Sequence, residues 1–155
     1  EFSNFRLAKK LIFYIKPHPT MTLSSLKKTM NFNVPSNFHF TEDNIDNLLA
    51  NADFVASSMS IVCLESISLG IPTFVYLEND YLNHNPIPSE ISDFMWKKFK
   101  NHNDLLKNYT FFVSQDSKTK INNIKYANEI KLNYFEPFSK KGISDLTLNK
   151  VSFNE

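Results

Sequence analysis

Glycine and cysteine are scarce in this chain of 155 residues, which contains two glycines and one cysteine. Gly70 and Gly142 cannot build a glycine-rich dinucleotide fingerprint or a phosphate-binding P-loop, because both motifs need closely spaced glycines. A single cysteine excludes a disulfide framework and a cysteine-based zinc site, and it favours a reducing compartment. No apolar run approaches the roughly 18 residues of a membrane-spanning helix.

An excess of charge of one sign is also missing, because 17 basic residues stand against 16 acidic ones. That balance argues against binding through bulk electrostatics, so no nucleic-acid partner is expected. No histidine pair has metal-ligand spacing with a carboxylate, and we expect neither a metal site nor a cofactor. Apolar residues are abundant at 42%, with 15 Phe, which favours one folded domain over disorder.

The first half of the chain alternates strand-like and helical patterns. Residues 11–15 form a short apolar run, typical of a buried parallel strand, which ends at Pro17. Gly70 and Pro72 mark the end of a helix. The alternation predicts an α/β fold, a Rossmann-like parallel sheet with helices on both faces. The expected strands are 11–15, 37–40, 53–57 and 73–76, and the expected helices are 23–30, 41–49 and 60–69.

The second half carries weaker signals. We expect a loop over 78–92, a helix over 93–106, a last strand over 110–113 and a weakly amphipathic helix over 117–133. The sequence therefore predicts a nucleotide-binding domain over residues 1–133. A C-terminal tail over 134–155 is expected to be partly disordered or to pack on a missing N-terminal domain. Since the chain begins with Glu1 and lacks a signal-type apolar core, we expect it to be part of a larger protein.

Two polar segments, 16–19 and 57–60, directly follow predicted strands. Ligands of an open parallel sheet bind outside the carboxyl ends of its strands. The second segment opens a helix, whose free N–H groups attract phosphate, and Ser60 adds a hydroxyl. His18 could donate a second hydrogen bond to the same phosphate. Glu65, farther along the helix, could accept hydrogen bonds from ribose hydroxyls.

Each candidate residue also has a structural interpretation. A histidine between prolines is often structural, Ser60 could serve only as a helix cap, and Glu65 could pair with a lysine. Cys63 is expected to be a small buried hydrophobe. Residues 94–99 are aromatic and basic, which suits either a packed helix or contact with a membrane or lipid-linked acceptor. Weaker candidates for contact with a donor sugar follow the strand at 73–76: Asp80, Tyr81 and His84.

Four segments together resemble the C-terminal half of GT-B-type glycosyltransferases. They are KPHP at 16–19, LLANADFV at 48–55, SMSIVCLES at 58–66 and LGIPTFVY at 69–76. The most similar group makes bacterial surface polysaccharides and carries a His-Pro motif and a serine motif. It includes sialyl- and polysialyltransferases, capsule Kdo transferases and CDP-glycerol glycerophosphotransferases. The resemblance covers residues 11–76 and departs from the family's frequent serine pair.

The resemblance implies a donor-nucleotide-binding domain of a capsule or lipopolysaccharide glycosyltransferase. The donor sugar is implied to be activated by CMP, CDP or UDP, with CMP or CDP favoured. His18 is implied to be catalytic, by stabilising the leaving phosphate. A glycan or lipid-linked acceptor and the catalytic base belong to the missing N-terminal domain, so this fragment alone is not expected to turn over. The implied location is the cytoplasm, with peripheral contact at the inner face of the membrane. The implied donor-binding residues are Lys16, His18, Pro19, Ser58, Met59, Ser60, Ile61 and Glu65.

Two alternative functions remain open from the sequence. The first is a nucleotide domain similar to that of epimerases acting on UDP-N-acetylhexosamine, which share a His-Pro, Ser and Glu layout. The second is a non-catalytic α/β interaction module with a decayed nucleotide site.

Overall fold

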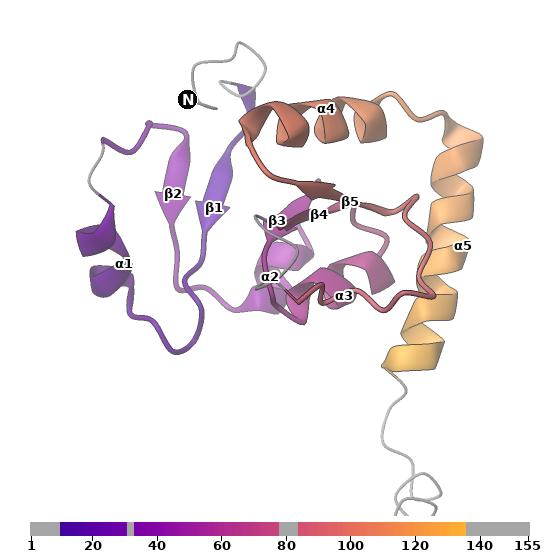
Figure 1. Ribbon diagram of the computed structural model, residues 1–155, viewed down its shortest axis with the longest axis horizontal. Coiled ribbons are helices and arrows are strands. Elements are labelled where there is room, and N and C mark those ends of the chain that lie inside the picture. The colour runs from indigo at the N-terminus through magenta and orange to yellow at the C-terminus, as the bar shows by residue number, and fades with distance from the viewer. Residues whose placement is uncertain (1–9, 31–32, 78–83, 136–155) are drawn as a thin grey trace, which may run out of the picture.

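The computed structural model describes residues 10–30, 33–77 and 84–135. These residues form a mixed α/β fold of short parallel strands and helices, which confirms the predicted Rossmann-like α/β class (Figure 1). The elements in chain order are β1 (Phe13–Ile15), α1 (Leu23–Thr29), β2 (Phe38–Phe40), α2 (Ile45–Leu49), β3 (Val55–Ser57), α3 (Val62–Ser68), β4 (Thr73–Tyr76), β5 (Trp96–Phe99), α4 (His102–Val113) and α5 (Ser117–Tyr134).

β1 and β2 form a two-stranded parallel sheet. Phe13 is in register with Phe38, and their rings stack with centroids 4.4 Å apart. The connection between the strands contains α1, which begins where the Thr22 hydroxyl accepts a hydrogen bond from the Ser25 N–H. On α1, the Lys27 ammonium lies 5.1 Å from the centroid of the Phe40 ring, so this helix lies against β2 (Figure 1).

β3, β4 and β5 form a second parallel sheet with β4 in the centre. Phe74 and Val75 of β4 are completely buried. Phe74 contacts Phe112 of α4, whereas the Thr73 hydroxyl is hydrogen-bonded to Ser66 of α3. Helices therefore cover both faces of this sheet, with α4 on one side and α2 and α3 on the other (Figure 1).

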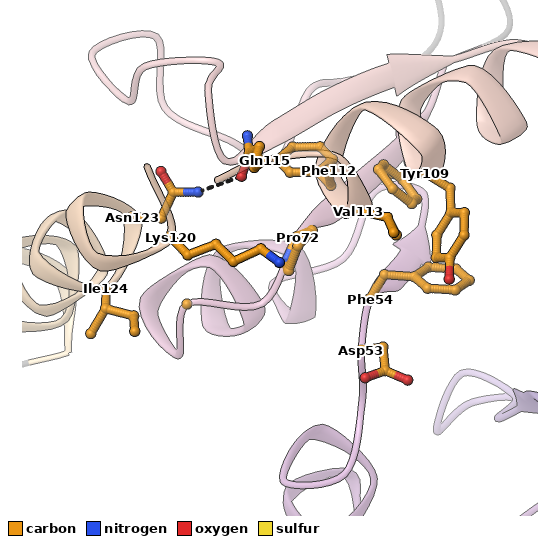
Figure 2. Close-up of a pocket in the computed structure, with 12 residues that line it drawn as sticks. Asp53, Phe54, Pro72, Tyr109, Phe112, Val113, Gln115, Lys120, Asn123 and Ile124 are labelled. Carbon is orange, nitrogen blue, oxygen red and sulfur yellow. Dashed lines mark hydrogen bonds between the residues drawn. The ribbon is translucent and has the colours of Figure 1, made fainter. Parts of the chain in front are cut away.

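A row of aromatic rings connects the two sheets. Phe54, which precedes β3, lies 6.0 Å from Phe13 of β1 and 5.4 Å from Phe74 of β4, measured between ring centroids. Tyr109 of α4 packs edge-on against Phe54 at 5.3 Å (Figure 2). β1 and β3 are not hydrogen-bonded to each other, so the aromatic side chains bring the sheets together without a continuous strand ladder.

α5 packs against α3 at the glycine that ends α3. Gly70 has a φ of +80°, in the left-handed region where glycine is favoured, as the sequence predicts. A Cβ at this position would lie 3.9 Å from the Cβ of Ala127. Ala127 and Ile130 are buried in the main core together with Cys63 and Ile67 of α3.

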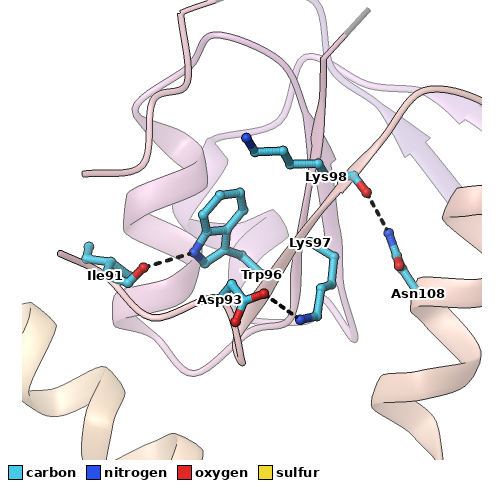
Figure 3. Close-up of polar contacts among 6 residues, drawn as sticks. All are labelled: Ile91, Asp93, Trp96, Lys97, Lys98 and Asn108. Atoms are coloured by element: carbon cyan, nitrogen blue, oxygen red, sulfur yellow. Dashed lines mark hydrogen bonds and ion pairs between the residues drawn. The ribbon is translucent and has the colours of Figure 1, made fainter. Parts of the chain in front are cut away.

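The predicted helix over 93–106 is confirmed only for 102–106, and the predicted strand over 110–113 is wrong. Residues 96–99 are β5, and 110–113 belong to α4. Asn101 explains the change, because its side chain accepts hydrogen bonds from two backbone N–H groups and starts α4 there. β5 is held by contacts on both sides: Trp96 Nε1 donates to the Ile91 carbonyl, Lys97 pairs with Asp93 at 2.9 Å, and Asn108 donates to the Lys98 carbonyl (Figure 3).

The remaining differences concern the ends of elements. α2 begins at Ile45, four residues later than the predicted start at Thr41, because the Asn44 side chain accepts from the Asp46 N–H. α3 begins at Val62, two residues after the predicted start. α5 ends at Tyr134, and residues 136–155 of the predicted tail lie outside the described residues. In the described part of the chain, no helix combines the length and apolar character needed to cross a bilayer.

Candidate functional site

A cavity of about 970 Å³ lies between the two sheets. One wall is formed by residues 10–16, which run along β1, and the opposite wall by residues 51–57, which run along β3. α2 and Val62, in the first turn of α3, complete the lining. The volume is within the range of about 300–1,000 Å³ that holds small molecules and cofactors.

The cavity reaches the carboxyl ends of β1 and β3, where the chain leaves the two sheets in different directions. After β1 the chain passes through α1 to β2, and after β3 it passes through α3 to β4 on the far side. A position where neighbouring connections diverge in this way is the usual ligand-binding crevice of an open α/β sheet. Lys16 and Ser57, the residues that line the cavity at these ends, begin the two polar segments of the sequence.

His18 is exposed, and its ring is oriented by Thr20. The Thr20 hydroxyl lies 2.8 Å from Nδ1, and the Thr20 backbone N–H donates to the same nitrogen at 3.3 Å. Because a backbone N–H can only donate, Nδ1 acts as the acceptor, and the neutral ring carries its proton on Nε2. This tautomer leaves an N–H donor on the side of the ring that faces away from Thr20.

Lys16 is half-buried and holds the segment between β2 and α2. Its Nζ donates to the carbonyl of Asp43 at 2.7 Å and to that of Glu42 at 3.4 Å. An ammonium has three donors, so one remains for another acceptor. Pro19, which follows His18, is exposed, and the Met21 N–H closes a turn onto the His18 carbonyl at 2.8 Å.

Residues 58–60 form a tight turn between β3 and α3, called the serine turn below. The Ser60 N–H donates to the Ser58 carbonyl at 2.7 Å. The Ser60 hydroxyl accepts from the Val62 N–H at 3.4 Å, while Ile61 occupies the N-cap position. Ile61 makes no side-chain cap, so the capping contact comes from Ser60, one residue earlier, as its structural interpretation predicts. The Ser60 carbonyl also accepts from the Cys63 N–H at 3.1 Å.

Cys63 lies beneath the serine turn. Its Sγ donates to the Ser58 carbonyl at 3.4 Å, and the side chain is fully buried, as the sequence predicts. Burial raises the pKa of this thiol to about 11, because the thiolate would lose its hydration. The cysteine is therefore a neutral packing residue at physiological pH.

Two apolar side chains flank Ser60 on the surface. Met59 is 56% exposed and Ile61 is 59% exposed. The Met59 sulfur accepts a hydrogen bond from the His84 N–H at 3.3 Å. The loop that follows β4 thus returns to the serine turn, as parallel strands with a common carboxyl edge allow.

Glu65 lies in the first turn of α3 and is half-buried. Within the described ranges, the ion pair between Lys97 and Asp93 is the one salt bridge found, so the lysine partner considered for Glu65 is not observed there. A half-buried carboxylate is stabilised when it accepts hydrogen bonds, and ligand hydroxyls are suitable donors.

The structure brings the two polar segments to one cavity, but no hydrogen bond joins His18 to Ser60 among the described residues. His18 is two residues beyond Lys16, and Ser60 is three beyond Ser57. Neither His18 nor Ser60 lines the cavity, which the two segments reach through their first residues.

Sequence reasoning missed Thr20, although a threonine two residues after a histidine is a detectable signal for a ring partner. Asp80 and Tyr81 lie outside the described residues. No group of three or more His, Cys, Asp or Glu side chains that could hold a metal ion occurs in the part of the chain that the structure describes.

A second cavity, of about 440 Å³, lies at the opposite ends of β3 and β4 (Figure 2). Asp53 and Phe54 precede β3, and Pro72 precedes β4. The amide of Asn123 donates to Gln115 Oε1 at 2.9 Å, so this polar pair is already matched. Ligands of parallel sheets bind at the other edge, and the larger cavity is accordingly the better candidate.

Comparisons of this chain with protein families, with curated proteins and with solved structures find no match.

Proposed function

We propose that this chain is the donor-nucleotide-binding domain of a glycosyltransferase of bacterial surface-polysaccharide synthesis. The observation that carries the proposal is the cavity between β1 and β3. At the carboxyl ends of these strands it is lined by Lys16, which begins the segment with the His-Pro motif, and by Ser57, which precedes the serine turn. The same segments carry the resemblance to GT-B enzymes. The donor is a sugar activated by CMP, CDP or UDP, with CMP or CDP favoured.

The chemistry follows from the charge that develops during transfer. When the bond between the sugar and the donor phosphate breaks, negative charge grows on the leaving phosphate. An N–H donor at Nε2 of His18 and the proton of the Ser60 hydroxyl, whose oxygen accepts from the Val62 N–H, are suited to stabilise it. Lys16 retains one N–H donor for the same anion. Glu65 accepts hydrogen bonds from ribose hydroxyls.

Parts of the reaction lie outside this domain in the proposal. The glycan or lipid-linked acceptor and the catalytic base belong to an N-terminal domain, and the whole enzyme works in the cytoplasm, at the inner face of the membrane. Met95 and Trp96 of the aromatic, basic stretch are 1% and 7% exposed, so these two side chains serve the core and are not part of a membrane-contacting face.

Isothermal titration of the chain with CMP, CDP and UDP tests the proposal. One charge-assisted hydrogen bond contributes roughly 1.5–3 kcal/mol, so His18→Ala should weaken the best of the three nucleotides by about tenfold or more. Ser60→Ala should weaken it about fivefold, the effect of roughly 1 kcal/mol.

His39→Ala is the matched control, because His39 is an exposed histidine on β2 that does not line the cavity. The His39→Ala variant should bind the nucleotide with the same affinity as the unsubstituted chain. If a folded chain binds none of the three nucleotides, or if His18→Ala and Ser60→Ala bind as well as the control, the donor site is refuted and an interaction module is the better explanation.

A further inference from the structure

The loop over 84–92 is attached to the last helix of the described chain by two tyrosine hydroxyls. Tyr126 accepts a hydrogen bond from the Ser92 N–H at 2.8 Å, and Tyr134 donates to Glu90 Oε1 at 2.5 Å. The Tyr126 ring also packs on Phe94, with centroids 4.6 Å apart. The Tyr134 hydrogen bond lowers the pKa of the Glu90 carboxyl, since it stabilises the ionised form.

Apolar side chains of the same loop are buried in the core. Ile87 and Ile91 are 3% and 5% exposed, and they belong to the core cluster that contains Ala127 and Ile130 of α5. The loop is therefore fixed to α5 through its backbone, a carboxylate and two buried isoleucines, so its position depends on where α5 lies.

At its other end the loop contacts the serine turn. The His84 N–H donates to the Met59 sulfur, and Met59 lies between Ser58 and Ser60. A continuous series of contacts therefore runs from the tyrosines of α5, through the loop, to the turn proposed above to bind the donor phosphate. Each contact joins residues that are between 25 and 44 positions apart in sequence.

We propose that the 84–92 loop positions the serine turn and that Tyr126 and Tyr134 are the residues that position this loop. The inference rests on the proposed function. Neither tyrosine touches the nucleotide. They hold the loop so that His84 stays against Met59. This contact keeps the serine turn in the conformation in which the Ser60 N–H donates to the Ser58 carbonyl and the Ser60 hydroxyl, beside the Val62 N–H, has its own proton to donate to an anion.

Removing the two hydroxyls tests this role. Tyr126→Phe keeps the ring on Phe94 but loses the acceptor for the Ser92 N–H, and Tyr134→Phe loses the donor to Glu90. The double variant should bind CDP about 2- to 30-fold more weakly, the range seen when residues of a coupling network are changed. Tyr109→Phe is the matched control, because the Tyr109 hydroxyl has no hydrogen bond among the described residues and lines the other cavity.

Hydrogen exchange of the free protein gives a readout that needs no nucleotide. In the double variant the Ser60 amide, which donates to the Ser58 carbonyl, should exchange faster, while the amides of β4 keep their rates. A purely structural role would instead raise exchange across the core. Glu90→Gln keeps an oxygen that accepts from Tyr134 and should retain affinity, whereas Glu90→Ala should not.

The outcomes separate the two proposals. If the unsubstituted chain binds CDP and the double variant binds it equally well, the positioning role is wrong and the donor site stands. If no nucleotide binds but exchange at Ser60 still rises in the double variant, the coupling is supported and the proposed function is refuted. Unchanged exchange at Ser60 overturns the positioning role in either case.

Discussion

Replacing Thr73 by Val tests the buried hydroxyl pair that joins α3 to β4. Thr73 and Ser66 are both completely buried, and their hydroxyl oxygens lie 2.7 Å apart. The Thr73 hydroxyl is also 3.0 Å from the Ile71 carbonyl, and the Ser66 hydroxyl is 3.0 Å from the Cys63 carbonyl. This pair fixes the helix that carries Glu65 and follows the serine turn.

The magnitude follows from counting protons. Two hydroxyl protons serve three contacts, so two of the three are hydrogen bonds at any moment. Thr73→Val removes one proton and leaves a similar volume, so the expected loss is about 1–2 kcal/mol of unfolding free energy. Ser66→Ala should lose a similar amount. One hydrogen bond remains in each single variant, because the remaining hydroxyl donates to its own carbonyl, and none remains in the double variant. The two losses should therefore add, to about 2–4 kcal/mol.

Urea denaturation measures these losses, with fluorescence of the single tryptophan as the probe. Trp96 is 7% exposed in the folded chain, so its emission reports on the same core. Thr73→Ser, which keeps the hydroxyl and removes a methyl group, is the control for lost packing. Unchanged stability of Thr73→Val, or a double variant no less stable than the single variants, would refute the assigned hydrogen bonds.

Two further predictions concern the same region. Gly70→Ala should lower the free energy of unfolding by about 1–2 kcal/mol, because an L-residue is strained at a φ of +80°. Its Cβ would lie at an ordinary 3.8 Å from Ile124 Cγ1, so the loss comes from the backbone and not from a clash. Thermal unfolding measures the loss, and a variant as stable as the original chain contradicts the backbone strain. Because the pKa of the Cys63 thiol is raised in the folded chain, the unfolded chain loses this proton at a lower pH. The stabilisation that the neutral thiol provides is therefore complete below the ordinary thiol pKa and is lost as the pH rises toward about 11. The stability difference between the original chain and Cys63→Ala should therefore shrink between pH 9 and pH 11 in urea titrations, and a constant difference would argue against a buried neutral thiol.

Several elements could be predicted because their signals are local. The apolar run before Pro17 contains β1, and the sequence from Ser60 to Tyr76 contains α3, its left-handed Gly70 and β4. The candidate residues His18, Ser60 and Glu65 rest on equally local signals, since strand ends and helix starts can be recognised within a few residues, and their roles stay predictions.

Other features could not be predicted, because their free energy comes from distant partners. Residues 96–99 suit a helix by pattern, but the hydrogen-bonding edge of β4 and the Asn101 cap make them β5. The contact between His84 and Met59 joins segments 25 residues apart, and no local pattern indicates it.

The sequence by itself determined the α/β class and the two polar segments at strand ends, because hydrophobic periodicity, proline and glycine act on their own neighbourhood. Tertiary structure alone decided that β1 and β3 face each other across a cavity, and that Tyr126 and Tyr134 hold the loop beside the serine turn. Such contacts form only when separate elements have packed, since the gain from burying their side chains together offsets the entropy lost in closing the long segments between them.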